Sequence, residues 1–314
     1  MTKLIIQIPS FNEEETLLTT LNDLPKSING IDEIQVLVIN DGSTDRTREI
    51  ALEWGASVID IKPNKGLANA FRTGLNQGLK MGADIIVNTD ADNQYCASDI
   101  AKLVAPICEG NADIAVGARD IFKIKEFSPV KKILQKVGSA VLRHLSSTNV
   151  LDAPSGFRAF SRQAAMRINV FDNYTYTMET LIQAGAKELR VVSVPIKVNP
   201  QLRKSKLVKN IFDYIYQSMK TTIRMFIVYR PFRFFITLSG LVGLLGFTLV
   251  CRFLYFYLQG DGNGHIQSLI FAAVFLISAV ILVIVAIIGD LLSINRKLLE
   301  DIQTRVKNIE FERK

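Results

Sequence analysis

Histidine and cysteine are scarce in this chain. Its 314 residues include only two histidines, His144 and His265, and three cysteines with neither paired nor metal-like spacing. The shortage of histidine argues against a histidine-rich metal site and against a Ser-His-Asp hydrolase. The few unpaired cysteines fit a reducing compartment.

Two common nucleotide-binding motifs are also missing. No Gly-x-Gly-x-x-Gly follows the first apolar run at residues 3–9, which disfavours a dinucleotide cofactor. No glycine-rich loop ends in Lys-Ser or Lys-Thr, which argues against a phosphate-loop ATPase. A nucleotide that binds this chain therefore needs another kind of site.

Hydrophobic residues, in contrast, make up 48% of the sequence and gather in two long runs. Residues 234–251 and 266–288 are each long enough to cross a bilayer as a helix, and the second run carries no charge. A short polar loop, 259–265, connects them. The sequence therefore predicts a transmembrane hairpin over residues 233–292.

Positive charge gathers immediately before this hairpin. Residues 201–235 carry eight Lys or Arg side chains against one acid, Asp213, whereas residues 1–200 carry 22 basic and 23 acidic side chains. Basic residues beside a membrane span favour the cytoplasmic side and anionic headgroups, so membrane lipids rather than nucleic acid are the predicted partner. We predict basic amphipathic interface helices over residues 201–232, with an ordinary basic surface helix as the alternative.

The predicted topology places both termini on the cytoplasmic side of the plasma (inner) membrane, because the loop 259–265 contains no Lys or Arg. Residues 293–314 are then expected to form a cytoplasmic helix with apolar side chains at regular spacing. Such a helix either pairs with a second subunit, giving a homo-oligomer, or stands alone, and the sequence leaves both open.

Residues 1–200 alternate short apolar runs with amphipathic stretches and form one predicted cytoplasmic domain. The apolar runs are residues 3–9, 34–40, 56–61, 84–89, 113–118 and 190–198, and helical stretches begin near Glu13, Thr44, Leu67 and Ser98. This alternation predicts an α/β fold with a mostly parallel sheet covered on both faces. In such sheets, ligands bind beyond the carboxyl ends of the strands.

Four of the apolar runs end in polar stretches, which read "PSFNEEE", "NDGSTD", "NTDADNQ" and "GARD". Asp41, Asp90, Asp92 and Arg119 should therefore lie along one edge of the sheet. Two carboxylates and the amide oxygen of Gln94 suit a hard cation such as Mg²⁺ or Mn²⁺, which commonly takes its other ligands from substrate phosphates. Lys65 and Arg72 surround a helix start nearby, so a nucleoside diphosphate bearing a transferable group fits this edge.

These segments, taken in order, resemble family 2 glycosyltransferases of the GT-A fold. They are most similar to membrane-anchored polyprenyl-phosphate sugar synthases of the dolichyl-phosphate mannose synthase type. The resemblance covers about residues 3–210, and the two-helix hairpin is similar to that of the bacterial members.

The resemblance implies a nucleotide-sugar site in the N-terminal domain. "IPSFNEEETL" looks like the opening motif of the family, with Phe11 in the place of a tyrosine, and "VINDGSTDRT" looks like the base-binding segment, with Asp41 reading the nucleobase. "DADNQ" implies that Asp90, Asp92 and Gln94 contact the metal and the diphosphate. The nucleotide-sugar residues expected are Pro9, Phe11, Asn12, Glu13, Asp41, Gly42, Lys65, Arg72, Asp90, Ala91 and Asp92.

The resemblance also implies an acceptor site. "VGARD" implies a substrate-binding Arg119, and "DAPSGFRAFSR" matches the Ser-Gly-Phe-Arg segment of the family. The Arg-x-x-Gly-x-Ser-Lys motif of the family is shortened here to "RKSK". The residues expected at the acceptor phosphate are Ser155, Gly156, Arg158, Arg203, Ser205 and Lys206. The expected catalytic residues are Asp90, Asp92, Arg119 and Arg158.

The implied activity is a metal-dependent, inverting transfer of one hexosyl or N-acetylhexosaminyl group from a UDP- or GDP-sugar to undecaprenyl or dolichyl phosphate at the cytoplasmic membrane face. The product would be a lipid-linked sugar donor for cell-envelope glycans or glycoproteins. A polymerising enzyme is disfavoured, because the only tryptophan, Trp54, is not in a Gln-x-x-Arg-Trp motif. The sugar, the base and the lipid length stay open.

Several alternatives remain at this stage. The acceptor could be a protein or glycolipid hydroxyl, or the chain could be a membrane-anchored scaffold with a degenerate transferase domain. Single residues also have structural alternatives: Asp41 could serve a turn and helix cap, Arg119 a surface ion pair, and Glu13 a helix N-terminus.

Overall fold

The computed structural model describes residues 1–120, 148–171, 176–200, 211–260 and 263–312, together with isolated positions between 132 and 146. The chain divides into two compact units. The first, Met1–Ile223 with Ile302–Lys314, contains the β-sheet and is called the sheet unit below. The second, Arg224–Asp301, contains two long apolar helices and is called the hairpin unit.

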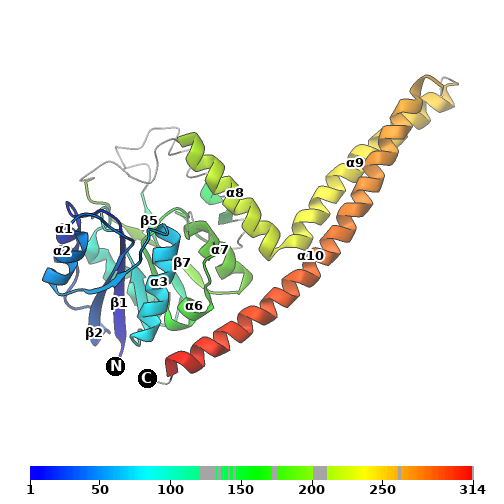
Figure 1. Cartoon of the computed structure of the whole chain (residues 1–314). Helices are drawn as coiled ribbons and strands as arrows, with labels where there is room; N and C mark the ends of the chain where they lie inside the picture. Colours follow the sequence, from blue (N-terminus) through cyan, green and yellow to red (C-terminus); the bar gives the residue numbers. More distant parts are fainter. Residues whose placement is uncertain are drawn as a thin grey trace. The chain divides into compact units, whose positions relative to one another are not determined.

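The sheet unit is built on one seven-stranded sheet with the order β3-β2-β1-β4-β6-β5-β7 (Figure 1). The strands are β1 (Lys3–Ser10), β2 (Glu33–Asn40), β3 (Ser57–Asp60), β4 (Ile85–Asn88), β5 (Ile114–Arg119), β6 (Arg158–Ser161) and β7 (Val191–Ile196). Every neighbouring pair is parallel except for β6, which runs antiparallel to both β4 and β5. Six strands therefore end, and β6 begins, at the same edge of the sheet. We call this the carboxyl edge.

Helices cover both faces of the sheet, as the near-continuous apolar strands predict. In the sheet unit they are α1 (Leu17–Asp23), α2 (Thr47–Trp54), α3 (Leu67–Lys80), η1 (Ala97–Asp99), α4 (Ile100–Cys108), α6 (Arg162–Arg167) and α7 (Thr177–Ala186). On one face, Leu4, Ile6 and Ile8 of β1 join a buried cluster with α1 and α4. On the other face, α3 lies against β1 and β2, with α6 beside it (Figure 1).

Helix α3 approaches the sheet closely because two glycines lie one turn apart on its inner face. A Cβ atom on Gly74 would lie 2.9 Å from Cδ1 of Ile39, and one on Gly78 would lie 2.9 Å from Cδ1 of Ile86. Side chains of β2 and β4 thus fill the space that a larger residue would need. This close contact fixes the N-terminus of α3 at the carboxyl edge.

The remaining helices are α8 (Ile211–Tyr229), α9 (Pro231–Leu258), η2 (Asn263–His265) and α10 (Ile266–Glu312). By length and composition α9 and α10 could each cross a membrane, with mean hydropathies of 2.2 and 3.3. Within the hairpin unit they pack through small residues: the Ser239 hydroxyl donates to the carbonyl oxygen of Ala279 at 2.8 Å, and Gly246 leaves room for Leu276. Close approach through small residues is typical of helix pairs in membranes.

The α/β fold with a mostly parallel sheet, which the sequence predicted, is confirmed. The order of elements also follows the prediction, and α3 begins at Leu67 as expected. Strand β6 was not predicted. The expected separate helix over residues 293–314 is instead the continuation of α10, which runs without a break for 47 residues, or about 70 Å at 1.5 Å per residue.

Candidate active site

The carboxyl edge brings together the loops that follow β1 and β2. Asn12, in the left-handed conformation at φ 54°, donates its backbone N–H to the Ser43 hydroxyl at 3.0 Å. Its side-chain oxygen accepts the backbone N–H of Thr44 at 2.9 Å. The backbone N–H of Glu13 donates to the hydroxyl of Thr47 at 2.8 Å. The segments expected to bind the nucleotide therefore lie side by side. The side chain of Phe11 is exposed to solvent.

Asp41, directly after β2, is buried and holds the start of α3. Its two carboxylate oxygens accept the backbone N–H groups of Lys65 at 2.9 Å and Gly66 at 2.8 Å. Gly42 has a φ of +77°, and a Cβ atom there would lie 3.0 Å from the backbone nitrogen of Asn64. Asp41 thus has a structural role in positioning Lys65. Its contact with a nucleobase stays a prediction.

The loop after β4 carries Asp90, Asp92 and Gln94, and it is fixed from two sides. On one side the Thr20 hydroxyl donates to the carbonyl oxygen of Ala91 at 2.9 Å. On the other, the backbone N–H of Asn199 donates to the carbonyl oxygen of Gln94 at 2.9 Å. Within the loop, the backbone N–H of Gln94 donates to the Asp92 carboxylate at 3.2 Å. Helix α1 and the segment after β7 thus hold this loop in place.

Gly156 lies beside the Asp90 carboxylate because β6 is antiparallel and begins at the same edge where β4 ends. A Cβ atom on Gly156 would lie 3.2 Å from an Asp90 carboxylate oxygen and 2.7 Å from the Tyr176 hydroxyl. The backbone N–H of Gly156 donates to the Tyr95 hydroxyl at 3.1 Å, and its carbonyl oxygen accepts from the Asn88 amide at 2.9 Å. Asn88, Tyr95 and Tyr176 therefore clamp Gly156 against Asp90.

The two tyrosines of this clamp stay protonated at neutral pH. Burial raises the pKa of Tyr95 to about 12, with Asp90 and Asp152 adding to the effect against the opposing charge of Arg119. Burial, again with Asp90, raises the pKa of Tyr176 well above its ordinary value. Both phenols therefore act as neutral hydrogen-bonding groups next to the carboxylate of Asp90.

Arg119, at the end of β5, forms a buried two-point ion pair with Asp152. Its Nε lies 2.6 Å and its Nη2 lies 3.1 Å from the two carboxylate oxygens. Burial opposes the charged form, but Tyr95, Asp152 and Asp90 together raise the pKa of Arg119 above its ordinary value. The ion pair that the sequence allowed at the surface is therefore internal, and it ties β5 to the segment before β6.

Arg158, expected to contact the acceptor phosphate, is completely buried in β6. Its guanidinium donates to the carbonyl oxygens of Ala153 at 2.7 Å, Ser155 at 2.8 Å and Thr177 at 2.9 Å, and to the Thr180 hydroxyl at 2.5 Å. Burial lowers the pKa of Arg158 to about 10, which still leaves it charged at neutral pH. In this arrangement Arg158 holds the 153–155 segment, and its contact with the acceptor phosphate stays a prediction.

Of the other expected residues, Ser155 and Arg72 lie in the described part of the chain, and three do not. Ser155 is fully buried beside Gly156, and its hydroxyl has no hydrogen-bond partner in the described part of the chain. Arg72 donates to the carbonyl oxygen of Val170 at 3.4 Å. Arg203, Ser205 and Lys206 lie outside the described residues.

Four residues of the site were not expected from the sequence: Asn88, Tyr95, Asp152 and Tyr176. Tyr95 follows "DADNQ" directly, Asn88 precedes it by two residues, and Asp152 opens "DAPSGFR", so proximity to a motif was an available signal. Nothing in the sequence around Tyr176 pointed to the site, because only the fold brings Tyr176 beside Gly156.

The edge thus combines two carboxylates and an amide oxygen, which suit a hard divalent cation, with neutral phenols, a clamped glycine and a nearby lysine. Among the residues that the structure describes, no three His, Cys, Asp or Glu side chains cluster as a complete metal site. Oxygen atoms of a bound diphosphate would have to supply the missing ligands. The geometry therefore suits a cation that is bound together with a nucleoside diphosphate.

Comparison with known proteins identifies the class. The chain belongs to the family described as glycosyl transferase family 2, whose pattern matches residues 5–168. It is 34% identical over 213 residues to a UDP-N-acetylglucosamine–dolichyl-phosphate N-acetylglucosaminyltransferase of Methanococcus voltae, covering 60% of this chain and 83% of the relative. It is 30% identical over 234 residues to a dolichol-phosphate mannosyltransferase of Pyrococcus furiosus, covering 69% and 64%.

Among solved structures, glucosyl-3-phosphoglycerate synthase from Mycobacterium tuberculosis, in complex with Mn²⁺, UDP-glucose and phosphoglyceric acid, has a similar fold. The TM-score is 0.57 at 20% identity, over 72% of this chain and 79% of that chain. At this identity the likeness concerns the fold alone. It confirms the expected GT-A-type architecture of the sheet unit, and the chain is a glycosyltransferase of family 2.

Proposed function

We propose that this glycosyltransferase transfers a single sugar from a nucleotide diphosphate sugar to a polyprenyl phosphate at a membrane surface. The observation that carries the proposal is the Asp90–Gln94 loop, held against Gly156 at the carboxyl edge of a chain that also has two long apolar helices. The names of the relatives support the same acceptor, because they act on dolichyl phosphate or dolichol phosphate.

Asp90, Asp92 and Gln94 fit Mg²⁺ or Mn²⁺ by donor type, since all three offer hard oxygen atoms. When bound, such a cation would neutralise charge on the departing nucleoside diphosphate. Residues of the chain itself position the groups around this site. Asp41 orients the loop of Lys65 toward the nucleotide side of the edge, and the clamp of Asn88, Tyr95 and Tyr176 fixes the distance between Asp90 and Gly156.

A phosphate acceptor would also explain why the described part of the edge offers no histidine as a base. A phosphate monoester has its second pKa near 6 and is largely dianionic at neutral pH, so it attacks without losing a proton. A hydroxyl acceptor would need a general base. An attacking dianion opposite the leaving diphosphate gives inversion at the anomeric carbon. It also requires positive charge to approach Asp90 and Asp92, for which Lys206, Arg203 and Arg119 are our candidates.

The unpartnered hydroxyl of Ser155 fits this acceptor site. A buried hydroxyl without a partner is costly, and a phosphate oxygen next to Gly156 would satisfy it. Arg158 then acts as a positioning residue. Two of its four hydrogen bonds go to the carbonyl oxygens of Ala153 and Ser155, so Ser155 and Gly156 are held in place before the acceptor arrives.

Two long apolar helices suggest membrane anchoring. We propose that the catalytic domain and both termini lie in the cytoplasm, because residues 201–235, around the start of α9, carry eight Lys or Arg side chains and residues 259–265 carry none. Tags at Thr2 and Lys314 should then be protected in intact cells, whereas an impermeant probe should label the loop 259–265. Labelling at either terminus would contradict this topology.

The activity is tested with the full-length protein in nanodiscs, a panel of labelled UDP- and GDP-sugars, and undecaprenyl or dolichyl phosphate. We expect label to enter the lipid from one of these donors, and the matched polyprenol without phosphate to accept far less. Better transfer to the alcohol would instead support a hydroxyl acceptor. Metal-dependent nucleotide binding without turnover on any acceptor would support the scaffold alternative.

A further inference from the structure

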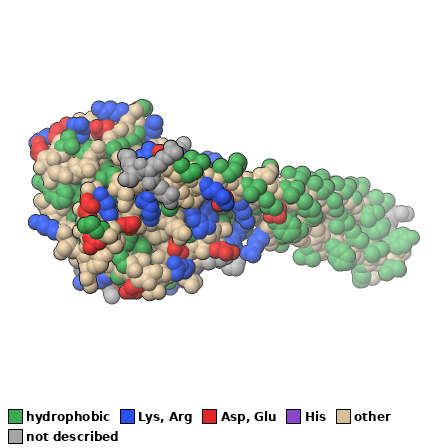
Figure 2. Space-filling model, turned by 90° about the horizontal axis from the view of Figure 1, so that it is seen from below, with side chains coloured by type: hydrophobic (Ala, Val, Ile, Leu, Met, Phe, Trp, Pro, Cys, Tyr) green, Lys and Arg blue, Asp and Glu red, His purple; other side chains and the backbone are tan. Residues whose placement is uncertain are grey.

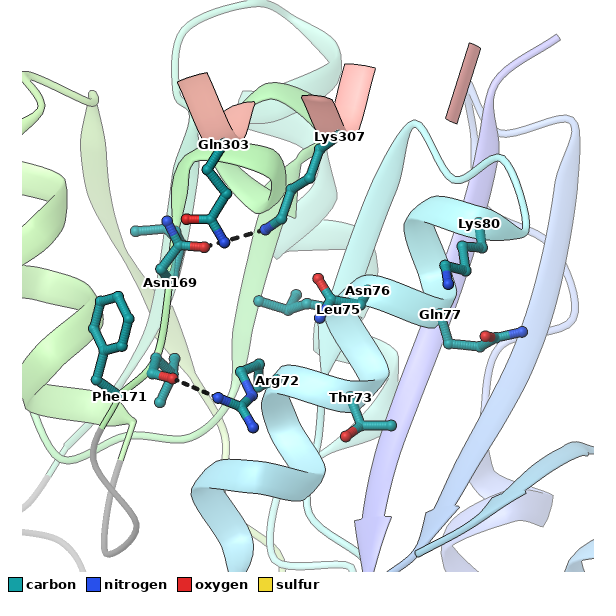
Figure 3. A pocket seen from close by; sticks show the side chains of 12 residues that line it. Arg72, Thr73, Leu75, Asn76, Gln77, Lys80, Asn169, Phe171, Gln303 and Lys307 are labelled. Atoms are coloured by element: carbon teal, nitrogen blue, oxygen red, sulfur yellow. Dashed lines mark hydrogen bonds between the residues drawn. The ribbon is translucent and has the colours of Figure 1, made fainter. Parts of the chain in front are cut away.

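A cavity of about 410 Å³ lies in the sheet unit (Figure 3), and none of the residues that line it belongs to the Asp90 loop. Its walls come from α3, from the segment 168–171 and from the last turns of α10. Arg72, Lys80 and Lys307 contribute three cations, and none of the lining residues is acidic. The cavity is therefore a positively charged pocket.

The two innermost cations of this pocket are held by neutral partners. Nζ of Lys307 donates to the Asn169 side-chain oxygen at 3.2 Å and faces the Met166 carbonyl oxygen at 3.4 Å. Arg72 donates to the carbonyl oxygen of Val170 (Figure 3). In the part of the chain that the structure describes, no ion pair involves either Arg72 or Lys307.

The charge balance around Lys307 remains positive. Burial lowers the pKa of Lys307, and the neighbouring Lys187 and Arg72 lower it further, against the opposing charge of Glu310. Glu310 is itself paired with Lys80 at 3.2 Å. A buried lysine among like charges is destabilised, and an added anion would relieve this repulsion.

The pocket also offers neutral donors and an apolar wall. The amides of Asn76, Gln77 and Gln303 line it beside the hydroxyl of Thr73, while Leu75, Ile168 and Phe171 provide apolar surface. Its size lies within the range of small-molecule sites, which typically combine apolar walls with a few fixed polar groups. An arginine next to a lysine is a favourable arrangement for phosphate oxygens.

We propose that this pocket is a second binding site, for a phosphate-bearing anion with a small organic part. The site is separate from the sugar-transfer site. Helix α3 begins at the carboxyl edge, where Asp41 holds Gly66, and Lys80 lies 14 residues further on, about 20 Å along the helix. Bound phosphate would join Arg72 of α3 to Lys307 of α10, so it would fasten residues 302–312 to the body of the sheet unit.

Binding is tested with full-length protein in phosphatidylcholine nanodiscs, with chelator present so that no divalent cation supports nucleotide binding at Asp90 and Asp92. The probes are inorganic phosphate and glucose 6-phosphate. We expect each to slow hydrogen exchange in residues 303–311 and 168–171. Lys307→Gln should weaken the apparent affinity about tenfold, because it removes one charge-assisted hydrogen bond.

Two variants serve as controls. Lys307→Arg keeps the charge and should retain binding, whereas Lys26→Gln makes the same change of net charge at an exposed lysine outside the pocket and should leave binding unchanged. Equal affinity in Lys307→Gln and wild type would overturn the proposal. So would binding that Asp92→Asn abolishes and Lys307→Gln does not, because the anion would then occupy the transfer site.

The phosphate could come from a soluble metabolite or from a lipid headgroup, and a second comparison separates these sources. Nanodiscs containing phosphatidylglycerol should protect residues 303–311 without any added probe if the headgroup reaches the pocket. Protection by glucose 6-phosphate alone would assign the site to a soluble ligand. Absence of protection in both arms would refute the second site.

Discussion

The sheet unit buries apolar side chains in its core, whereas the hairpin unit exposes many of its own. In the sheet unit Leu4, Ile6 and Ile8 are fully buried, whereas in the hairpin unit Leu241 is 60% exposed and Ile281 is 54% exposed. Figure 2 shows the same difference, because the surface of the hairpin is almost entirely hydrophobic while that of the sheet unit is mixed. Such a surface is stable only against an apolar solvent, which agrees with membrane anchoring.

Polar groups show the reverse arrangement. The sheet unit buries Gln7, Asn88 and Arg158 completely and engages each of them in hydrogen bonds, such as the 2.8 Å bond from the Gln7 amide nitrogen to the Asn88 side-chain oxygen. These bonds lead to Gly156 and so to the active site. In the hairpin unit the helices instead meet through Ser239, Gly243 and Gly246. Buried polar groups therefore support the candidate active site, whereas the close contact of small residues is typical of helix pairs in membranes.

The largest expected effect separates catalytic from structural polar groups. Asp92→Asn should reduce turnover about a thousandfold, the equivalent of about 4 kcal/mol of lost charge stabilisation, while the melting temperature stays near that of wild type. Glu53→Gln, the same chemical change at an exposed site, should leave turnover unchanged. Full activity of Asp92→Asn, or of wild type in excess chelator, would remove the metal assignment.

Arg158 provides the next test, on the structural side. Arg158→Met leaves the carbonyl oxygens of Ala153, Ser155 and Thr177 without their donor, so we expect a loss of about 3 kcal/mol in the free energy of unfolding. Arg158→Lys should rescue little, since one ammonium cannot replace the planar fork. Denaturant unfolding measures this loss. Wild-type stability with weakened acceptor binding alone would restore the role predicted from the sequence.

A matched pair of substitutions compares a side chain exposed to water with one exposed to lipid. Leu52 of the sheet unit and Ile281 of the hairpin are similarly exposed, at 45% and 54%. Leu52→Lys should change the stability by less than about 0.5 kcal/mol. Ile281→Lys should cost about 3 kcal/mol of membrane insertion, because a charge would then face lipid. The fraction of membrane-integrated protein after expression gives the comparison, and equal fractions would argue against the span.

The smallest effect concerns alkaline pH. Because the pKa of Tyr95 is about 12 in the folded chain, against about 10 for an unfolded tyrosine, the buried phenol stabilises the fold fully below pH 10. This contribution falls as the pH rises from 10 toward 12, and Tyr95→Phe should remove that part of the slope. Ultraviolet titration of phenolate in parallel with circular dichroism measures it. Ionisation of Tyr95 and Tyr176 well before unfolding would contradict their burial.

Much of the fold and the first half of the site could be predicted from local sequence. Alternating apolar runs predicted six of the seven strands, since parallel strands buried on both faces give continuous hydrophobic stretches. The loops after β1, β2 and β4 carry their polar residues next to those runs, so Asn12, Asp41 and Asp90 could be assigned to one edge.

The second half of the site could not be predicted in this way. Strand β6 is only four residues long, Arg158–Ser161, and reads as part of a loop motif. Without β6 there was no reason to place Gly156 beside Asp90 or to bury Arg158. Burial of Arg158 depends in part on acceptors from a distant segment, residues 177–180, which no local pattern reveals.

The antiparallel direction of β6 makes the stretch of chain after β5 a closed detour. The chain leaves the sheet at Arg119 and returns to it at Arg158, and both points lie at the carboxyl edge. The ion pair of Arg119 with Asp152 fastens the two ends of the detour together at its base. Because the chain leaves and re-enters the sheet at one edge, a change in the length of this stretch would leave the strand order of the sheet unchanged. The arginine and the aspartate of the ion pair would then hold its two ends together whatever lies between them.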